Sequence, residues 1–596
     1  MPLIHAVMPA PWWTPLTYRH TEALAPGLRV AAPLGRGFRV GVTVDSASAF
    51  TDESKIKSIA ELVDEAPVLP DELLRLALWF GETWFIGAGF ALKNLLPAKF
   101  FTNEKIPPSP ARGAAKASFS AHDVYDANLF TRYDRYVEML ENTDGPSLVL
   151  FPEVGMARAF WEALPPHLLD GGALWPASPS KQWKIWKEAQ AGRLKFVAGS
   201  PGAAFLPMPG LASIVMDEEN QGSWRTQSHP CFNIRSLLGT RAAFAGAKFI
   251  LGGAMPSSKG FLRAEPECPQ SKNESRLVFV SLKEAAASEF DALRDTLPIS
   301  EPLVRETAAA RRAGRWALWL LDRKGYAGEI VCDECGGSVR CVRCGSSMRW
   351  ERGVLRCLSC GERVTLPEKC PNCGGRLLQG VRPGLEALHE RAEGALKYKF
   401  KNVLLLQKND GEIPDAQKLK EDYPTGALIV GTRRLLSLCD GLSPAVVGWI
   451  DADAEARQPE YDAKAKAFAL LWESMWRGTD ALERRLVIQS RRPGKGWQEA
   501  LSRGWGLFWR RELKERREWE LPPYTPMLKV TMPKIYGPSF VETLQNRDFE
   551  YWISEEKDNE IWIRTKRFHE LAEILKPFFD IKGTRKGFPT VLLYLD

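Results

Sequence analysis

Residues 332–373 read CDECGGSVRCVRCGSSMRWERGVLRCLSCGERVTLPEKCPNC and contain eight of the chain's eleven cysteines. A C-x-x-C turn places two thiolates on one side of a tight loop, and two such loops complete a four-thiolate shell around Zn²⁺. This stretch therefore predicts two closed zinc sites, with no open coordination position for a catalytic water. The ligands fall in four pairs: Cys332 and Cys335, Cys341 and Cys344, Cys357 and Cys360, and Cys370 and Cys373.

The segment around these cysteines is rich in glycine, arginine and short polar turns, so we expect it to have little hydrophobic core of its own. Bound metal would then supply its folding free energy. An iron–sulfur cluster or redox-active dithiols are the other chemistries open to such pairs. Disulfides are the least favoured interpretation, because nothing else in the chain is typical of a secreted protein.

The composition indicates a water-soluble globular protein with several domains. A chain of 596 residues is too long for one hydrophobic core, and we expect three to five domains. The first residues have no basic region followed by an apolar one, and no run of about 18 apolar residues predicts a membrane span. We therefore expect a protein of the reducing cytoplasm. Its net charge of +7 permits a polyanionic partner.

Hydrophobic runs alternate with helical patterns in two long regions, which predicts two parallel α/β sheets. The expected strands of the first are Ser147–Phe151, Leu194–Ala198, Ala212–Met216 and Ala247–Leu251. Those of the second are Leu277–Val280, Ala317–Leu321, Asn402–Leu406, Ala427–Val430, Val446–Ile450 and Leu486–Gln489.

The predicted fold class is therefore α/β multidomain, with the cysteine segment as an insert in the second sheet region. A helical pattern covers Asp71–Thr83, and the proline-rich run Ile106–Pro110 predicts a linker. The predicted boundaries are an N-terminal unit at 1–103, a linker at 104–116, a first lobe at 117–265, a second lobe at 266–330 and 377–529, the insert at 331–376 and a C-terminal α+β domain at 530–596.

In this order the features resemble the primosomal protein N′ (PriA) family of replication-restart DNA helicases, over nearly the whole chain. The N-terminal unit, from Met1–Val7 through Tyr18 and Arg29–Gly35 to Leu62–Leu69, is similar to that family's domain for the 3′ end of a DNA strand. Further similar segments are Leu150–Gly155 (LFPEVG), Ile214–Asn220 (IVMDEEN), Gly252–Ser257 (GGAMPS), Asp322–Tyr326 (DRKGY), Val430–Arg433 (VGTR), Asp451–Asp453 (DAD) and Leu521–Tyr524 (LPPY). The resemblance rests on their shared order around an eight-cysteine insert.

The resemblance implies two RecA-like helicase lobes, a small mainly-β N-terminal DNA-binding domain and an ATP-dependent 3′–5′ DNA helicase activity. It implies two Zn²⁺ ions, and ATP with Mg²⁺. It also implies interleaved zinc pairing: Cys332/Cys335 with Cys370/Cys373, and Cys341/Cys344 with Cys357/Cys360. Spacing alone leaves sequential pairing open. The implied partners are branched or single-stranded DNA, primosome and helicase-loading proteins and single-stranded DNA-binding protein, at a cytoplasmic, nucleoid-associated location without a membrane.

The chain departs from this pattern where the family's ATP-binding loop should lie. A P-loop needs glycines whose backbone N–H groups cradle phosphates, followed by Lys-Ser or Lys-Thr. At the corresponding place, residues 127–136 read ANLFTRYDRY, and no glycine occurs between Gly113 and Gly145. Asp217 and Glu218 keep the chemistry of a Mg²⁺ ligand and a water-orienting base. Because we find no phosphate loop opposite them, we expect Asp217 and Glu218 to be acidic residues at a solvated strand end rather than a catalytic pair.

Two other family features are altered. The late motif with transition-state arginines corresponds to Glu473–Asp480 (ESMWRGTD), where one arginine, Arg477, remains. Loss of an arginine finger costs roughly 10³–10⁵ in rate. The 3′-end pocket usually has a Phe-Asp pair before its tyrosine, whereas this chain has Leu16-Thr17 there.

The candidate DNA contacts include Trp224 and Arg225. They follow Asp217–Glu219, which we call the acidic box, at the place where the family has an aromatic-rich loop. An equally good alternative is that Trp224 is packed between the two lobes. Arginines in the insert either contact phosphate or offset the charge of about −2 on each four-thiolate zinc site; they are Arg340, Arg343, Arg349, Arg352 and Arg356. The full set of candidate DNA contacts from the family motifs is Tyr18, Gly35, Trp224, Arg225, Arg323 and Lys324.

Three functions are open. The first, which we favour, is a PriA-like protein that binds forked DNA and helps assemble the primosome without ATP-driven unwinding. The second is an active 3′–5′ helicase with an atypical nucleotide site. The third is a zinc-dependent protein-interaction platform that does not bind DNA.

Overall fold

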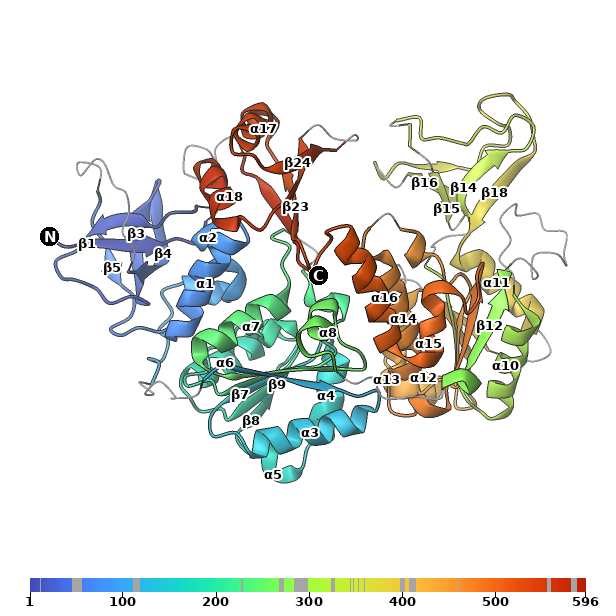
Figure 1. The fold of residues 1–596 in the computed structure, drawn as a ribbon, viewed down its shortest axis with the longest axis horizontal. Helices are drawn as coiled ribbons and strands as arrows, with labels where there is room; N and C mark the ends of the chain where they lie inside the picture. The colour runs from blue at the N-terminus through green and yellow to red at the C-terminus, as the bar shows by residue number, and fades with distance from the viewer. Residues whose placement is uncertain are drawn as a thin grey trace. The chain divides into compact units, whose positions relative to one another are not determined.

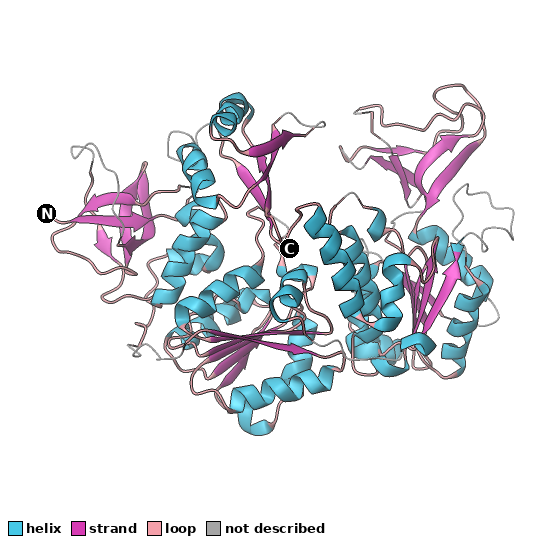
Figure 2. Cartoon of the chain, viewed as in Figure 1, coloured by secondary structure: helices cyan, strands magenta, loops and turns pink. Residues whose placement is uncertain are grey.

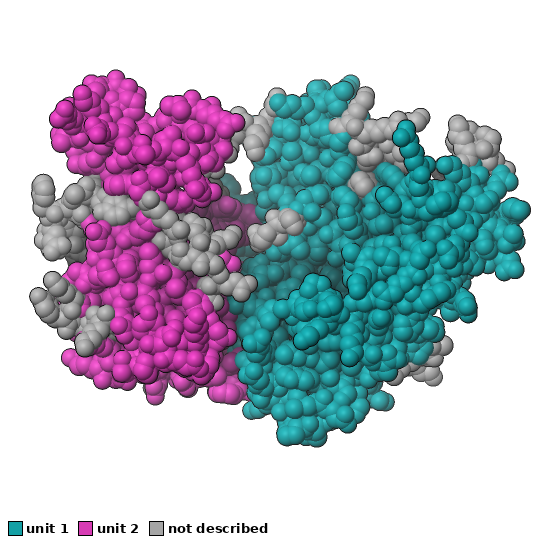
Figure 3. All heavy atoms as spheres, turned by 180° about the vertical axis from the view of Figure 1, so that it is seen from behind, with its two compact units in different colours: residues 1–126, 131–266, 513–596 teal, residues 127–130, 267–512 magenta. Residues whose placement is uncertain are grey.

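The described residues of the computed structural model form five β-sheets, and helices pack on the two six-stranded parallel ones (Figures 1 and 2). The chain divides into two compact units, one of residues 1–126, 131–266 and 513–596 and the other of 127–130 and 267–512 (Figure 3). The described residues are 1–10, 12–45, 56–110, 118–226, 229–266, 273–282, 299–322, 327–343, 345–346, 348–351, 353–357, 360–396, 402–406, 414–458, 460–554, 559–579 and 587–596.

The N-terminal unit is an antiparallel sheet followed by a helical pair. The sheet has the order β2-β1-β4-β3-β5, and its small core contains Ala6, Met8, Tyr18, Val30 and Ala32. Its elements are β1 (Leu3–Val7), β2 (Leu16–Arg19), β3 (Arg29–Leu34), β4 (Gly37–Val44), β5 (Glu61–Leu62), α1 (Asp71–Thr83) and α2 (Gly87–Leu95). The predicted helix is therefore confirmed, with the same bounds.

The first lobe is a parallel sheet of order β6-β11-β10-β7-β9-β8. Its strands are β6 (Ser120–Tyr125), β7 (Ser147–Leu150), β8 (Gly172–Leu174), β9 (Phe196–Gly199), β10 (Ser213–Met216) and β11 (Lys248–Gly253). Its helices are α3 (Leu129–Glu141), α4 (Val154–Glu162), α5 (Pro166–Leu169), α6 (Pro179–Gln190), α7 (Ile234–Ala245) and α8 (Ser258–Ala264). The four predicted strands are the central ones, whose near-continuous apolar runs suit burial on both faces of a parallel sheet.

The second lobe is also a parallel sheet, of order β12-β22-β21-β13-β20-β19. Its strands are β12 (Leu277–Ser281), β13 (Ala317–Leu320), β19 (Val403–Leu406), β20 (Leu428–Gly431), β21 (Val446–Trp449) and β22 (Arg485–Ser490). Its helices are α10 (Glu301–Arg312), α11 (Leu385–Leu396), α12 (Ala416–Asp422), α13 (Cys439–Leu442), α14 (Ala463–Trp476) and α15 (Ala500–Arg503), followed by α16 (Trp505–Glu518). All six predicted strands are present, and the two parallel α/β lobes of the predicted fold class are confirmed.

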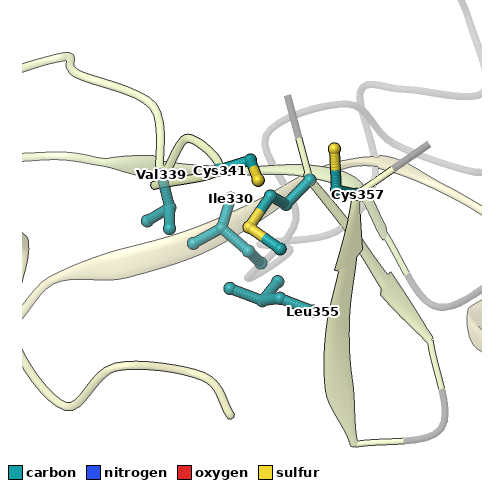
Figure 4. Close-up of a cluster of buried hydrophobic side chains, with 6 residues drawn as sticks. Ile330, Val339, Cys341, Leu355 and Cys357 are labelled. Atoms are coloured by element: carbon teal, nitrogen blue, oxygen red, sulfur yellow. The ribbon is translucent and has the colours of Figure 1, made fainter. Parts of the chain in front are cut away.

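The cysteine insert forms an antiparallel sheet of its own, in the order β17-β16-β15-β14-β18. Its strands are β14 (Ala327–Cys332), β15 (Met348–Glu351), β16 (Val354–Cys357), β17 (Arg363–Thr365) and β18 (Leu378–Pro383). The insert nevertheless has a small hydrophobic core of its own. A cluster of buried side chains includes Ile330, Val339, Met348 and Leu355 together with Cys341 and Cys357 (Figure 4). Hydrophobic burial therefore holds the insert together alongside its sulfur clusters.

The C-terminal domain has the element order βαββαβ and an antiparallel sheet of order β24-β25-β23-β26. Its elements are β23 (Met527–Thr531), α17 (Gly537–Asn546), β24 (Glu550–Ile553), β25 (Glu560–Arg564), α18 (Phe568–Leu575) and β26 (Thr590–Tyr594). Alternate residues of β23, β25 and β26 are buried, so one face of this sheet faces the domain core and the other does not. Among the described residues, none of these helices is long and apolar enough to cross a lipid bilayer.

Candidate functional site

The acidic box lies at the carboxyl end of β10, in the middle of the first parallel sheet. Asp217 follows the strand directly, and its backbone N–H donates to the carbonyl of Leu150 at 2.9 Å. Ligands of open α/β sheets bind outside the carboxyl ends of their strands. The three acidic residues Asp217, Glu218 and Glu219 are therefore where a nucleotide site of this fold would place its metal ligand.

Helix α3 fills this position with two of its own side chains. The guanidinium of Arg132 donates to both carboxylate oxygens of Asp217, at 2.9 and 3.3 Å, and to Glu218 Oε1 at 2.7 Å. The hydroxyl of Tyr136 donates to Asp217 Oδ1 at 2.7 Å. Arg132 and Tyr136 are four residues apart, so they lie on one face of the helix. Asp217 therefore accepts hydrogen bonds from this chain where a catalytic acid would hold Mg²⁺.

Burial strengthens this arrangement. Asp217 and Tyr136 are fully buried, and Arg132 is 2% exposed. Burial alone would lower the pKa of the Arg132 guanidinium, but Asp217 and Glu218 raise it. Burial, and then the charge of Asp217, raise the pKa of the Tyr136 hydroxyl well above its ordinary value, which keeps it a donor. The prediction that Asp217 lies at a solvated strand end is wrong. Arg132, which belongs to residues 127–136, forms a buried ion pair with it.

The remaining two acids of the box are also engaged. Both carboxylate oxygens of Glu218 lie 3.3 Å from the backbone N–H of Ala254. Glu219 accepts from Arg235 at 2.5 Å, from the Tyr125 hydroxyl at 2.9 Å and from the Ser257 backbone N–H at 2.6 Å.

Glu219 also links the first lobe to the C-terminal domain through Arg235. That guanidinium makes a second ion pair with Asp596, whose carboxylate also accepts from Asn233 at 3.2 Å. Each acid of the box is therefore part of the protein's internal structure. Sequence reasoning did not assign Glu219, because its partners are distant along the chain.

Arg477, the arginine retained from the late helicase motif, is committed to internal ion pairs in the second lobe. It donates to Asp440 at 2.9 and 2.7 Å and to Glu473 at 2.7 Å, with 3% of its side chain exposed. An arginine that acts on a phosphoryl group must reach the developing charge. In this structure, carboxylates already satisfy the guanidinium of Arg477.

The cysteines of the insert gather in two groups. The first contains Cys332, Cys335, Cys370 and Cys373, and the second contains Cys341, Cys357 and Cys360; Cys344 lies outside the described residues. Within each group, C-x-x-C pairs that are distant in sequence come together. This grouping is the interleaved arrangement that the resemblance implies.

The sulfur positions fit a four-coordinate metal. Sulfurs of Cys332 and Cys373 lie 3.7 Å apart, those of Cys335 and Cys370 3.7 Å, and those of Cys341 and Cys360 3.6 Å. Tetrahedral Zn²⁺ with bonds of about 2.3 Å requires a sulfur–sulfur distance of about 3.8 Å. Backbone N–H groups of Cys373 and Asn372 lower the pKa of the Cys370 thiol, whereas hydrogen bonding to neighbouring thiols raises that of Cys373, so the thiols of this group titrate together.

The predicted DNA contacts have different environments. Tyr18 is 3% exposed, donates to the carbonyl of Pro33 at 3.4 Å and has its pKa raised to about 12 by burial. Trp224 is 1% exposed and donates to the Glu218 carbonyl, so its expected role as a stacking platform does not fit this structure. The Arg225 guanidinium lies over the Tyr594 ring, 4.8 Å from its centroid.

Gly35 is exposed at the turn between β3 and β4, with a φ of +62° that favours glycine. Arg323 and Lys324 lie outside the described residues. At the position predicted for the 3′-end pocket, the Thr17 hydroxyl is 3.1 Å from the Nδ1 of His5.

Sequence reasoning missed an aromatic row on the open face of the C-terminal sheet. The ring centroids of Trp552 and Trp562 are 6.0 Å apart with parallel planes, and Trp562 and Tyr594 are 5.5 Å apart. Lys529 and Arg564 lie within 6.0 Å of these rings and are paired with Glu560 and Glu550, respectively. The alternation in Glu560–Arg564 (EIWIR) and Thr590–Tyr594 (TVLLY) is the signal that could have revealed it.

Aromatic side chains on an open sheet face can stack nucleic-acid bases, as in four-stranded RNA-recognition domains. Trp552 is 38% exposed, and Trp562 and Tyr594 are half-buried. The face is therefore partly accessible.

Known proteins match this chain in two ways. Residues 5–97 match the family model of the PriA 3′DNA-binding domain (3′BD). The replication restart protein PriA of Treponema pallidum is 22% identical, over 89% of this chain and 86% of that protein.

Two further PriA proteins match over less of their own length. That of Bacillus subtilis is 22% identical over 70% of this chain and 53% of its own length, and that of Thermotoga maritima is 25% identical over 58% and 47%. The matched region thus spans about half of these two proteins.

Among solved structures, the DUF1998 helicase MrfA bound to DNA and AMPPNP has a TM-score of 0.32 and 13% identity, over 67% of this chain and 49% of that chain. By sequence this chain is similar to replication restart PriA proteins, and its residues 5–97 match the PriA 3′DNA-binding domain.

Proposed function

We propose that this chain is a replication-restart protein that binds branched DNA and does not hydrolyse ATP to unwind it. The observation that carries the proposal is the buried ion pair between Arg132 and Asp217. A P-loop ATPase needs its acidic residue for Mg²⁺ and a glycine-rich loop for phosphate. Here a guanidinium lies on the carboxylate and residues 127–136 contain no glycine.

Displacing Arg132 would leave buried charges without partners. Removing one member of a buried, hydrogen-bonded ion pair costs roughly 3–5 kcal/mol. A tyrosine hydroxyl and a second carboxylate bind the same pair, which adds to that cost. Binding of Mg²⁺ and nucleotide at Asp217 would have to offset it without the help of a phosphate loop. We infer that the first lobe serves as a scaffold for DNA binding.

Two features support DNA as the partner. The N-terminal unit matches a 3′ DNA-binding domain, and the C-terminal sheet has an aromatic row on its open face. One would contact a strand end and the other unstacked bases. By their similarity to this chain, the PriA proteins also suggest primosome proteins, helicase-loading proteins and single-stranded DNA-binding protein as partners.

We further propose that the two cysteine groups hold two structural Zn²⁺ ions. Four thiolates close the coordination shell, so the metal would stabilise the insert without catalysing a reaction. The small hydrophobic core would leave part of the insert's stability independent of metal.

Equilibrium binding to a forked DNA and to a duplex of the same length, with and without ATP, tests this function. The proposal predicts tighter binding to the fork, weaker binding as salt concentration rises, and no effect of ATP. Equal affinity for fork and duplex would overturn the branched-DNA assignment. No DNA binding at low salt by the zinc-loaded protein would favour the protein-interaction platform instead.

A further inference from the structure

Three arginines lie side by side across the outer strands of the insert. In the antiparallel pairing of β15, β16 and β17, Arg349 is opposite Arg356, and Arg356 is opposite Arg363 (Figure 1 labels β15 and β16). Residues directly opposite one another in a sheet project from the same face. We call these three residues the arginine row.

The row lies on the face of these strands that points away from the cysteines. Met348, Leu355 and Cys357 alternate with the arginines along β15 and β16, and all three are buried in the insert's core. Successive side chains of a strand point to opposite faces. The arginines on this face are therefore not placed to offset the negative charge of the thiolates in the metal sites.

Acidic residues of the insert do not balance the row. Arg356 is 3.3 Å from Glu351, a residue of the same face, but Arg349 and Arg363 have no carboxylate partner among the described residues. Glu362, the acidic neighbour of Arg363, pairs with Arg343 instead, at 3.7 Å. Like charges directly opposite one another destabilise a sheet. An external anion would remove this repulsion.

A DNA phosphate backbone matches the row in spacing and chemistry. Neighbouring strands are about 4.8 Å apart, so three arginines cover about 10 Å. That length is close to three steps along one DNA strand, at about 3.4 Å of rise each, so the row spans about three to four successive phosphates. Guanidinium groups bind phosphate oxygens in a bidentate manner.

Among the described residues of β15, β16 and β17, this face offers no ring for a base to stack on. Its other residues are Glu351, Val354 and Thr365, while Trp350 belongs to the opposite face. This favours contact with the backbone of a duplex over contact with unstacked bases.

We propose that Arg349, Arg356 and Arg363 bind the phosphate backbone of a duplex arm of the DNA. This inference rests on the proposed function, which makes DNA the partner, and adds the surface of the insert that contacts it. The contact would not depend on base sequence. It would strengthen affinity by neutralising about three phosphates.

The test compares two triple variants of the full-length, zinc-loaded protein on forked DNA over a range of salt concentrations. One is Arg349→Gln, Arg356→Gln and Arg363→Gln. The matched control removes three charges elsewhere in the same unit, Arg305→Gln, Arg312→Gln and Arg503→Gln. Each phosphate contact contributes about 0.9 to the slope of log K against log salt. The row variant should therefore reduce the slope by about 2 to 3, and the control variant by less than 1.

A variant with lysine at all three row positions keeps the charge and should retain most of the slope. Metal analysis of each variant, with two zinc equivalents expected, shows that the insert is folded. Equal slopes for the row and control variants would overturn the inference and would indicate that the row binds another partner, such as an acidic protein. Absence of fork binding by the wild-type protein would instead overturn the proposed function.

Discussion

Arg132 and Asp217 form a buried ion pair although 85 residues separate them in the chain. The pair joins helix α3 to the end of the central strand β10, where an ATPase of this fold would bind Mg²⁺. Asp217, which an ATPase would need for binding Mg²⁺, therefore stabilises the first lobe in this protein. This relationship gives the acidic box a structural role in a chain whose residues 127–136 contain no glycine for a phosphate loop.

Replacing Arg132 with alanine should destabilise the protein strongly. The change leaves the fully buried Asp217 without its guanidinium partner, so we expect the free energy of unfolding to fall by about 3–5 kcal/mol. Urea denaturation measures the change. Arg193→Ala is the control, because it breaks an exposed ion pair with Glu188 and should leave the transition unchanged. If both variants unfold at the same urea concentration, the ion pair does not have the structural role assigned to it.

Zinc content distinguishes interleaved from sequential pairing. In the interleaved arrangement Cys335 and Cys370 belong to the same site, so the double variant Cys335→Ser and Cys370→Ser should keep one of two zinc equivalents. Sequential pairing would place these cysteines in different sites, and the same variant would then lose both. Metal analysis of the purified proteins separates the two results.

Removal of the metal should open the insert only in part. We expect chelation to increase protease cleavage within 331–376 while the two lobes remain intact. Cleavage should be incomplete, because Ile330, Met348 and Leu355 form a small core that does not depend on metal. Mass spectrometry of the fragments locates the cuts. An insert that resists protease equally well with and without metal would show that zinc does not contribute to its folding.

Trp562→Ala should weaken binding to single-stranded DNA through lost stacking. One aromatic–base contact is worth about 1–3 kcal/mol, which is roughly a 5- to 150-fold loss of affinity. Because the change removes no charge, the salt dependence should stay the same. The control Trp519→Ala removes a tryptophan that is 68% exposed and lies outside the aromatic row. A loss that is equal in the two variants would argue against the C-terminal sheet as a stacking surface.

Tyr18 should make the stability of the protein fall in alkaline solution. Burial raises its folded-state pKa to about 12, from an ordinary value of 10.0. Its contribution is complete below about pH 10 and is lost as the pH rises towards 12, because only the unfolded chain releases the proton in that window. Two pKa units correspond to about 2.7 kcal/mol. The unfolding free energy of wild type should therefore fall more steeply than that of Tyr18→Phe between pH 10 and 12, and parallel curves would contradict this.

The sequence predicted what local pattern determines. The central strands of both lobes are short apolar runs, such as SLVL in β7 and SIVM in β10, and burial on both faces makes such runs visible. The regular spacing of the cysteines predicted, in the same way, which residues come together in two groups that could hold a metal. The edge strands β6 and β8 escaped notice because one is largely polar and the other has three residues.

What the sequence did not predict depends on contacts between distant segments. Arg132 and Tyr136 were singled out only because their segment lacks the pattern of a P-loop. Nothing near them in sequence reveals that their partner is Asp217. The arginine row and the aromatic row likewise depend on which strands are neighbours and in what register. A one-residue shift in register would place these side chains on the opposite face.

The most direct test of the account is ATP hydrolysis by the zinc-loaded protein, measured with and without forked DNA. We predict a rate equal to that of buffer alone in both conditions, from protein that still binds the fork. Glu218→Gln is the companion variant, because it changes the more accessible acid of the box while preserving its shape. Fork-stimulated hydrolysis that Glu218→Gln abolishes would contradict the account and show that the acidic box still works as a catalytic site.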